Sequence, residues 1–218
     1  LTGGDFACRH KKSGMLFPAR CIEWERLCKG RRANMPTVFL SPSTQEYNAY
    51  YDGAGSEEYY MNRIADAMVP DLEASGITVL RNSTSDTAVT SAQKSNAGNA
   101  EFHLAIHSNA APENLAGTLR GTDVYYYTGS EKGRRAADIF ANNFSLISPT
   151  PQRVHVIATS RLAELRRTAV PAILIEIAYH DNPDDANWIR ANIRDIARNL
   201  SVSTADYFGV PFRQAVSG

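Results

Sequence analysis

The sequence predicts an α/β fold, a single domain with a largely parallel central sheet flanked by helices. From residue 36 onward, short β-branched or aromatic runs alternate with longer stretches of helical periodicity, which is the pattern of βαβ units. The 218 residues are enough to bury one substantial core, and too few for two ordinary enzyme domains with linkers. We therefore expect one catalytic domain.

The elements follow from local patterns. The apolar run Thr37–Ser41 predicts a first buried strand. Ser56 is a favourable N-cap, and the spacing of apolar residues after it predicts a helix over 57–75 that stops at Gly76. Further strands are expected at 77–81, 102–107, 124–127 and 172–178, and further helices at 88–97, 131–146 and 184–208. The run 172–178 is apolar except for Glu176, as in a central strand.

Residues 1–34 differ in composition from the rest of the chain. They hold eight Lys and Arg against three Asp and Glu, a net charge of +5, so the remaining residues carry −5. All three cysteines also lie in this segment, so a disulfide cannot hold the main domain together. We predict a boundary between a basic, cysteine-containing extension over 1–34, either an appendage or non-native sequence from an upstream reading frame, and a domain over 35–218.

A second interpretation of this extension is a zinc knuckle formed by Cys8, His10, Cys21 and Cys28. The spacing of these four residues matches no common zinc module, which disfavours the knuckle. A signal peptide is also disfavoured, because charged residues interrupt any apolar stretch of the segment. The sequence therefore indicates no route of export.

Composition excludes several classes of protein. No apolar run approaches the roughly 20 residues that span a bilayer, so membrane insertion is not expected. The residues after 34 are net acidic and would repel phosphate, so nucleic-acid binding is not expected either. The sequence makes no prediction of oligomeric state.

Glu176 is the residue that most suggests chemistry. An ionised carboxylate inside a buried strand is costly unless it is paired, hydrogen-bonded or bound to a metal. A salt bridge to Arg166 or Arg167 is the structural alternative to a functional role.

Histidines follow two of the predicted strands. Residues two apart on a strand share a face, so His107 lies on the face of His103, at the carboxyl end where ligand sites of α/β proteins form. His103, deeper in the strand, is interpreted as a core histidine. The same alternation places His180 on the face of Glu176. Two interpretations of His180 are open: it binds a metal or substrate, or it is a loop histidine with no such role.

A third candidate region opens the first long helix. Acidic residues at a helix start suit the helix dipole, so Glu57 and Glu58 also have a purely structural explanation.

Together these segments resemble the zinc-dependent N-acetylmuramoyl-L-alanine amidases, over about residues 37–208. The resemblance rests on the order and spacing of five features: a Ser-Pro turn after the first strand; a glutamate opening the first long helix, with Ile-Ala seven and eight residues later; Ile106-His-Ser-Asn-Ala110; Gly121-Thr-Asp-Val-Tyr-Tyr126; and Pro171-Ala-x-Leu-x-Glu176, followed by Asp181-Asn-Pro183.

The resemblance implies a zinc site and a catalytic base. The family's metal ligands correspond to Glu57, with Glu58 as the runner-up, and to His107. The family's catalytic base corresponds to Glu176. The family's first histidine ligand is absent, because Thr44 occupies its position. Our hypothesis is that His180 supplies the replacement ligand.

The implied activity is hydrolysis of the amide bond between N-acetylmuramic acid and the L-alanine of peptidoglycan stem peptides. Asn109 and Arg166 are expected to contact substrate, and Tyr47, Tyr50 and Tyr51 to line a glycan or peptide groove. The alternative is a non-catalytic module that binds the cell wall or another partner on a degenerate amidase fold. Both hypotheses predict a protein that acts at the cell wall or outside the cell.

Overall fold

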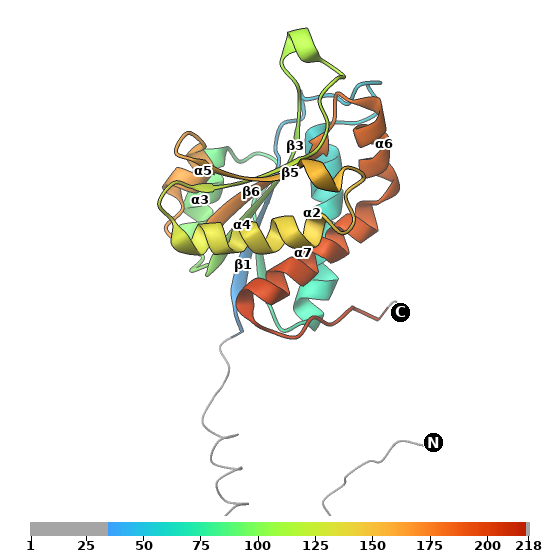
Figure 1. Cartoon of the computed structure of the whole chain (residues 1–218). Helices are drawn as coiled ribbons and strands as arrows, with labels where there is room; N and C mark the ends of the chain where they lie inside the picture. Colours follow the sequence, from blue (N-terminus) through green and yellow to red (C-terminus); the bar gives the residue numbers. More distant parts are fainter. Residues whose placement is uncertain (1–34, 217–218) are drawn as a thin grey trace, which may run out of the picture. The chain divides into compact units, whose positions relative to one another are not determined.

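The computed structural model describes residues 35–216, which form an α/β domain (Figure 1). The expectations for residues 1–34 lie outside this range, and the boundary after residue 34 stays a prediction. The strands are β1 Thr37–Pro42, β2 Thr78–Arg81, β3 Phe102–Asn109, β4 Thr122–Tyr127, β5 Val154–Thr159 and β6 Ala172–Tyr179. The helices are α2 Glu57–Ala74, α3 Ala88–Ala97, α4 Glu131–Phe144, α5 Ala163–Arg167, α6 Pro183–Ala191 and α7 Ile193–Phe208, with short 3-10 turns at Glu113–Leu115 and Pro151–Arg153.

The six strands form one sheet in the order β2-β1-β3-β6-β4-β5. Strands β2, β1, β3 and β6 run parallel, whereas β4 is antiparallel to β6 and carries β5 parallel to itself. The predicted largely parallel sheet is therefore confirmed. Because β1, β3 and β6 point the same way, their carboxyl ends meet at one edge, where ligand sites form in sheets of this kind.

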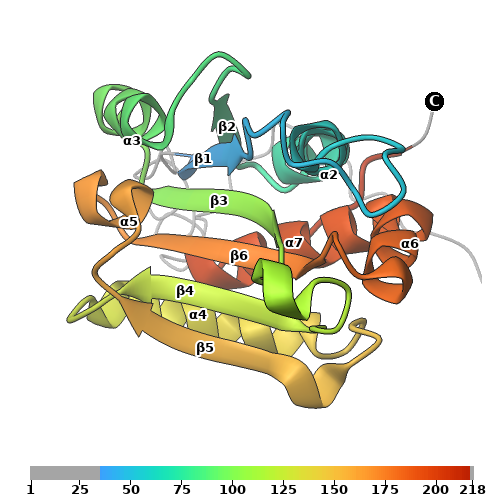
Figure 2. The same cartoon turned by 90° about the horizontal axis from the view of Figure 1, so that it is seen from above.

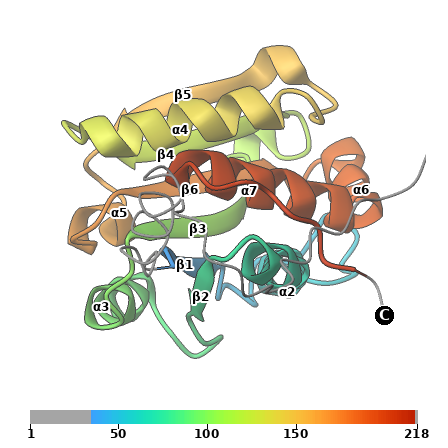
Figure 3. The same ribbon diagram turned by 90° about the horizontal axis from the view of Figure 1, so that it is seen from below.

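One face of the sheet carries the main core. Helix α7 packs between α2 and α4, and these three helices cover this face. Figure 2 shows the strands in front of α4 and α7, and Figure 3, from the opposite side, shows the two helices in front of the strands. Apolar side chains that alternate along the strands fill the space between the layers, among them Leu40, Leu104, Ile106, Ile173 and Ile175.

The opposite face is covered more lightly. A small apolar cluster of Ala105, Leu165, Ala172 and Leu174 fixes the short helix α5 on β3 and β6. The remaining positions on this face include polar residues, because His107 continues the alternation from Ala105 and Glu176 continues it from Leu174. The chemistry-bearing side chains therefore lie opposite the main core.

Three features of the fold differ from the sequence prediction. Strand β5 and helix α5 were not expected, and the expected helix over 184–208 is two helices, α6 and α7, joined at Asn192. None of the helices in residues 35–216 has the length and the apolar character that crossing a membrane requires.

Candidate functional site

A cavity of about 510 Å³ opens at the carboxyl ends of β1 and β3. Its wall combines the turn after β1, the start of α3, the segment leading into α5, and side chains of β3 and β6. The residues that line it are Ser41–Gln45, Tyr47, Asn82, Asp86–Ala88, Ser91, His107, Leu162–Glu164, Leu174 and Glu176. Two predicted site residues, His107 and Glu176, therefore share one cavity, and Thr44 lines it too.

Glu57 is held against His107 by the start of helix α2. Ser56 is the N-cap, and its hydroxyl accepts a hydrogen bond from the backbone N–H of Tyr59, which fixes the first turn. Oε1 of Glu57 then lies 2.8 Å from Nδ1 of His107, and Oε2 accepts a hydrogen bond of 2.7 Å from Asn48. The helix start and the end of strand β3 therefore meet as the sequence predicts.

The runner-up Glu58 does not share this position. Glu57 is only 1% exposed, whereas Glu58 is half-buried, one residue further along the helix. Its pKa is raised by burial and by the charge of Glu46, not by contact with the histidine. The geometry therefore selects Glu57 over Glu58 as the partner of His107.

The cap of α2 gives a first testable expectation. Ser56→Ala removes the acceptor for the Tyr59 N–H and should lower the free energy of unfolding by about 1 kcal/mol. Ser56→Asp, which restores a capping oxygen, should recover most of this loss. Chemical denaturation of the three proteins measures both values. Equal losses for the alanine and aspartate variants would contradict the assigned cap.

The negative charge of Glu57 and the positive charge of His107 shift the pKa of each other's side chain. Burial alone would raise the pKa of Glu57, but the hydrogen bond from His107 and its positive charge outweigh burial and lower it. Burial alone would lower the pKa of His107, but the hydrogen bond to Glu57 and the charges of Glu176, Glu57 and Glu164 raise it to about 9. Nδ1 of His107 therefore carries a proton that it donates to Glu57.

Glu176 lies directly beside His107, since the two residues are register partners on β6 and β3. Its Oε2 atom is buried and has no hydrogen-bond partner. None of the ion pairs within residues 35–216 joins Glu176 to Arg166 or Arg167, so the structural alternative is not realised. Burial raises the pKa of Glu176 to about 7, with the positive charge of His107 opposing the shift.

A further buried carboxylate, Glu164, was not predicted from the sequence. It lies on α5 and is 4% exposed. Its Oε1 accepts a hydrogen bond from the hydroxyl of Ser41 and lies 2.9 Å from Nε2 of His103. Its Oε2 lies 4.0 Å from Nε2 of His107. The one sequence signal was a glutamate between Leu162 and Leu165, within a segment too short to show helical periodicity.

His103 is a core histidine, as interpreted. It is fully buried on the face of His107, stacks on Phe39 with 5.3 Å between ring centroids, and contacts Glu164. Burial alone would raise the pKa of Glu164, but the hydrogen bond and charge of His103 lower it below its usual value. Glu164 is therefore ionised at neutral pH.

The placement predicted for His180 is wrong. The register of β3 and β6 shifts after His107, so that Asn109 pairs with Tyr179 and β6 gains one residue relative to β3. This extra residue turns His180 away from the face of Glu176. Nδ1 of His180 lies 2.8 Å from the carbonyl oxygen of Ser108, and the ring stacks on Tyr50 at 5.4 Å. His180 is buried there and does not line the cavity.

The other predicted substrate contacts lie outside the cavity wall. Asn109 donates a hydrogen bond of 3.4 Å to Asp123, and Arg166 is exposed on α5. Their roles in binding substrate stay predictions. Of the three candidate tyrosines, Tyr50 is buried in the core, Tyr51 is exposed beside Arg190, and only Tyr47 lines the cavity.

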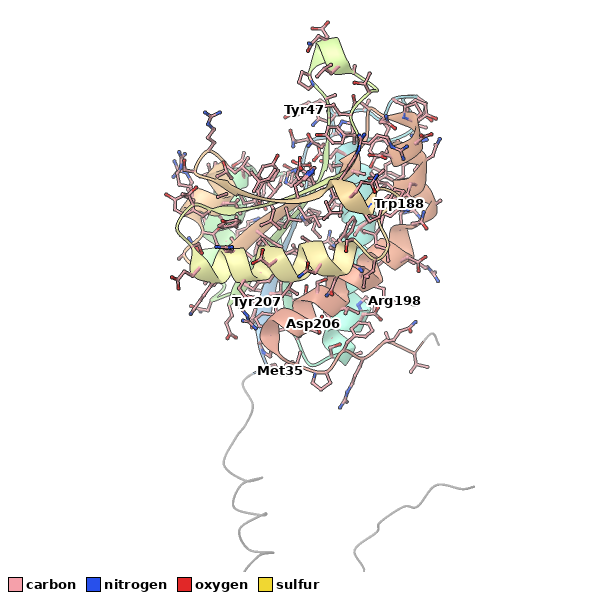
Figure 4. The ribbon with its side chains drawn as sticks, viewed as in Figure 1. Met35, Tyr47, Trp188, Arg198, Asp206 and Tyr207 are labelled. Atoms are coloured by element: carbon pink, nitrogen blue, oxygen red, sulfur yellow. The ribbon has the colours of Figure 1, made fainter. Side chains whose placement is uncertain are left out.

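Tyr47 is 80% exposed, and Figure 4 shows it at the end of the domain opposite Met35. An aromatic ring at the rim of a polar cavity offers a sugar or peptide an apolar surface. The rim therefore has one aromatic side chain free to contact a ligand.

Comparison with known proteins identifies the family of this chain. Residues 43–203 match the family described as N-acetylmuramoyl-L-alanine amidase. An uncharacterised protein of Clostridium perfringens, CPE1502, is 31% identical over 108 residues, which is 50% of this chain and 32% of that protein. A probable cell wall amidase of Staphylococcus aureus, LytH, is 30% identical over 135 residues, 62% of this chain and 43% of that protein. The matches thus span less than half of either relative.

A solved structure shares the fold. The catalytic domain of CwlV, an N-acetylmuramoyl-L-alanine amidase from Bacillus (Paenibacillus) polymyxa var. colistinus, matches with a TM-score of 0.70 at 16% identity, covering 81% of this chain and 100% of that domain. Since the family match spans residues 43–203, more than half of the chain, the chain belongs to the N-acetylmuramoyl-L-alanine amidase family.

Proposed function

We propose that this protein hydrolyses the amide bond between the lactyl group of N-acetylmuramic acid and the L-alanine of peptidoglycan stem peptides, at the cell wall. Membership of the amidase family supports the substrate class. The observation that carries the proposal is the meeting of Glu57, His107 and Glu176 beside one open cavity, from three segments distant in the sequence.

We propose Zn²⁺ as the cofactor. The donors suit a divalent cation, since one imidazole lies among the carboxylates of Glu57, Glu164 and Glu176. The unpartnered Oε2 of Glu176 is a buried polar atom that a nearby cation would stabilise. Within residues 35–216 no group of three His, Cys, Asp or Glu side chains is arranged to hold a metal ion, so the proposal of zinc rests on membership of the family. When bound, zinc would polarise the substrate carbonyl and would lower the pKa of water to roughly 7.

The protein's own residues supply the proton transfer. An amide resists hydrolysis, so the attacking water must lose a proton and the leaving amine must gain one. Glu176, with a pKa of about 7, is suited to take the first proton and return it to the amine. Glu57 holds the ring of His107 in place through Nδ1, which keeps Nε2 turned to the side of Glu164.

A non-catalytic module that binds the wall is the second candidate function. Thr44, at the position of the family's first histidine, favours it. The buried carboxylates oppose it, because a fold that only binds its partner has no need to keep Glu164 and Glu176 beside an open cavity.

Digestion of purified peptidoglycan separates the two candidates. We expect the protein to release stem peptides, to stop when a chelator removes divalent metal, and to recover on addition of Zn²⁺. Binding to the wall with no release of peptide at any metal concentration would instead support the non-catalytic module. Release that continues in the chelator would contradict the cofactor and leave the amidase proposal standing.

A further inference from the structure

We propose that Asp123 and His155 form a subsite that binds a side-chain ammonium group of the stem peptide, about three residues from the bond that is cut. This inference rests on the proposed amidase function, and it assigns the side of Glu176 on which the peptide part of the substrate lies.

A row of four titratable side chains crosses the more lightly covered face of the sheet. The strand register pairs them one after the next, in the order His107 on β3, Glu176 on β6, Asp123 on β4 and His155 on β5. Register partners on neighbouring strands present their side chains on the same face of a sheet. Figure 2 shows these four strands side by side. The row therefore runs from the cavity, through Glu176, to the strand at the edge of the sheet.

Hydrogen bonds hold the carboxylate of Asp123 in place within this row. Its Oδ1 lies 3.2 Å from Nδ1 of His155, and its Oδ2 accepts hydrogen bonds from the hydroxyl of Tyr125 at 3.3 Å and from the side-chain amide of Asn109 at 3.4 Å. The side chain of Asp123 is 14% exposed, whereas that of His155 is 57% exposed. When a neutral His155 donates its Nδ1 proton to Asp123, its Nε2 is a hydrogen-bond acceptor. The pair therefore offers an ammonium group a fixed negative charge and an acceptor on an exposed ring.

The surroundings of the pair favour a positively charged group. Burial raises the pKa of Tyr125, and the charges of Asp123 and Glu176 raise it further. The same causes, in the same order, raise the pKa of Tyr179. Within residues 35–216 no ion pair joins Asp123 or Glu176 to a lysine or arginine, and Oε2 of Glu176 is buried without a hydrogen-bond partner. A ligand can therefore supply the cation that this part of the sheet lacks.

The spacing of the strands indicates which part of the peptide reaches the pair. Neighbouring strands lie about 4.8 Å apart, so His155 stands roughly 10 Å from Glu176, two strands away. An extended peptide advances about 3.4 Å per residue, so this distance corresponds to about three residues. The cavity lies on the opposite side of Glu176, since none of its lining residues belongs to β4 or β5, and the aromatic ring of Tyr47 at its rim suits a sugar. We therefore place the glycan at the cavity and the peptide across β4 and β5.

Binding of a synthetic peptide to the full chain tests the subsite. The probe is N-acetyl-L-alanyl-D-isoglutaminyl-L-lysine, whose acetyl group stands in for the lactyl carbonyl, and it is compared with the same peptide acetylated at the lysine amine. A chelator is present so that the amide stays intact. Titration calorimetry should show the free amine binding about 5- to 10-fold more tightly, the effect of one partly buried ion pair.

Variants locate this preference for the free amine. Asp123→Asn should remove it, because the variant lacks the charge that attracts the amine, and Asp123→Glu should restore most of it. His155→Ala should reduce it by about 2-fold. Glu46→Gln removes one negative charge from an exposed side chain in the turn after β1, so it is the matched control and should keep the full preference.

Circular dichroism checks that each variant is folded. If Asp123→Asn does not fold, the two peptides on the unmodified protein and on His155→Ala still decide the question. Equal affinity for the two peptides, no binding of either, or a full preference in folded Asp123→Asn would overturn the subsite. A protein that shows the preference but releases no stem peptide from peptidoglycan would support the subsite and contradict the amidase proposal. Release of stem peptides without the preference would contradict the subsite alone.

Discussion

Replacing Glu176 by glutamine is expected to slow peptide release from purified peptidoglycan by about 10²- to 10⁴-fold, the contribution of a general acid–base group. The amide cannot take the proton from water, yet it fills the same space. Since Oε2 of Glu176 has no hydrogen-bond partner, the substitution breaks no hydrogen bond at that atom. Initial rates of peptide release at saturating Zn²⁺ measure the effect, with Glu46→Gln as the control.

The same substitution should stabilise the protein above neutral pH when a chelator is present. Burial raises the pKa of Glu176 from 4.5 to about 7. The contribution of the protonated side chain to the free energy of unfolding is therefore fully present below pH 4.5 and is lost as the pH rises through 7. At pH 8 the ionised carboxylate therefore costs on the order of 3 kcal/mol relative to its protonated form. Glutamine has no such penalty. A variant that loses activity and stability together at pH 8 would contradict the assigned role and point to a structural one.

Asp185→Asn is expected to cause the largest loss of stability. Asp185 is fully buried at the start of α6, and its carboxylate accepts hydrogen bonds from the Arg120 side chain at 2.7 Å and from the backbone N–H groups of Gly121 at 3.1 Å and Tyr179 at 3.2 Å. It therefore joins the start of β4 to the end of β6. Removing one partner of a buried ion pair costs about 3–5 kcal/mol.

Asp184→Asn is the matched control, because Asp184 binds the same Arg120 at 2.8 Å but its side chain is 73% exposed. An exposed pair contributes less than about 1 kcal/mol, so this variant should unfold nearly as the unmodified protein does. Denaturant unfolding of both variants compares the two sites. Losses of similar size would show that burial of Asp185 is not what makes its contacts strong.

Most of the fold follows from periodicity and turn residues. The helix that begins at Glu57 and the buried strand around Glu176 could both be predicted from the spacing of apolar residues in their own local sequence. Strand β5 was missed because it lies at the sheet edge with its residues exposed or half-buried, so its sequence carries no clear alternation. Helix α5 has five residues, too few to show a helical period.

The site was predictable in part, for a physical reason. His107 and Glu176 lie near the carboxyl ends of neighbouring parallel strands, and the carboxyl ends of such strands meet at one edge. The position of His180 could not be derived, because the register shift after His107 depends on pairing between β3 and β6 and leaves no mark in either segment alone. Glu164 reaches the cavity only because α5 folds back onto the sheet, a long-range contact that its local sequence does not encode.

Mass spectrometry of the products from digested peptidoglycan tests the proposed activity most directly. We expect glycan strands whose N-acetylmuramic acid carries a free lactyl carboxyl group, together with stem peptides that begin with a free amino group on L-alanine. Both products should form about 10²- to 10⁴-fold more slowly with Glu176→Gln. Products cut within the peptide or the glycan, or an untouched polymer in the presence of Zn²⁺, would contradict the proposed amidase.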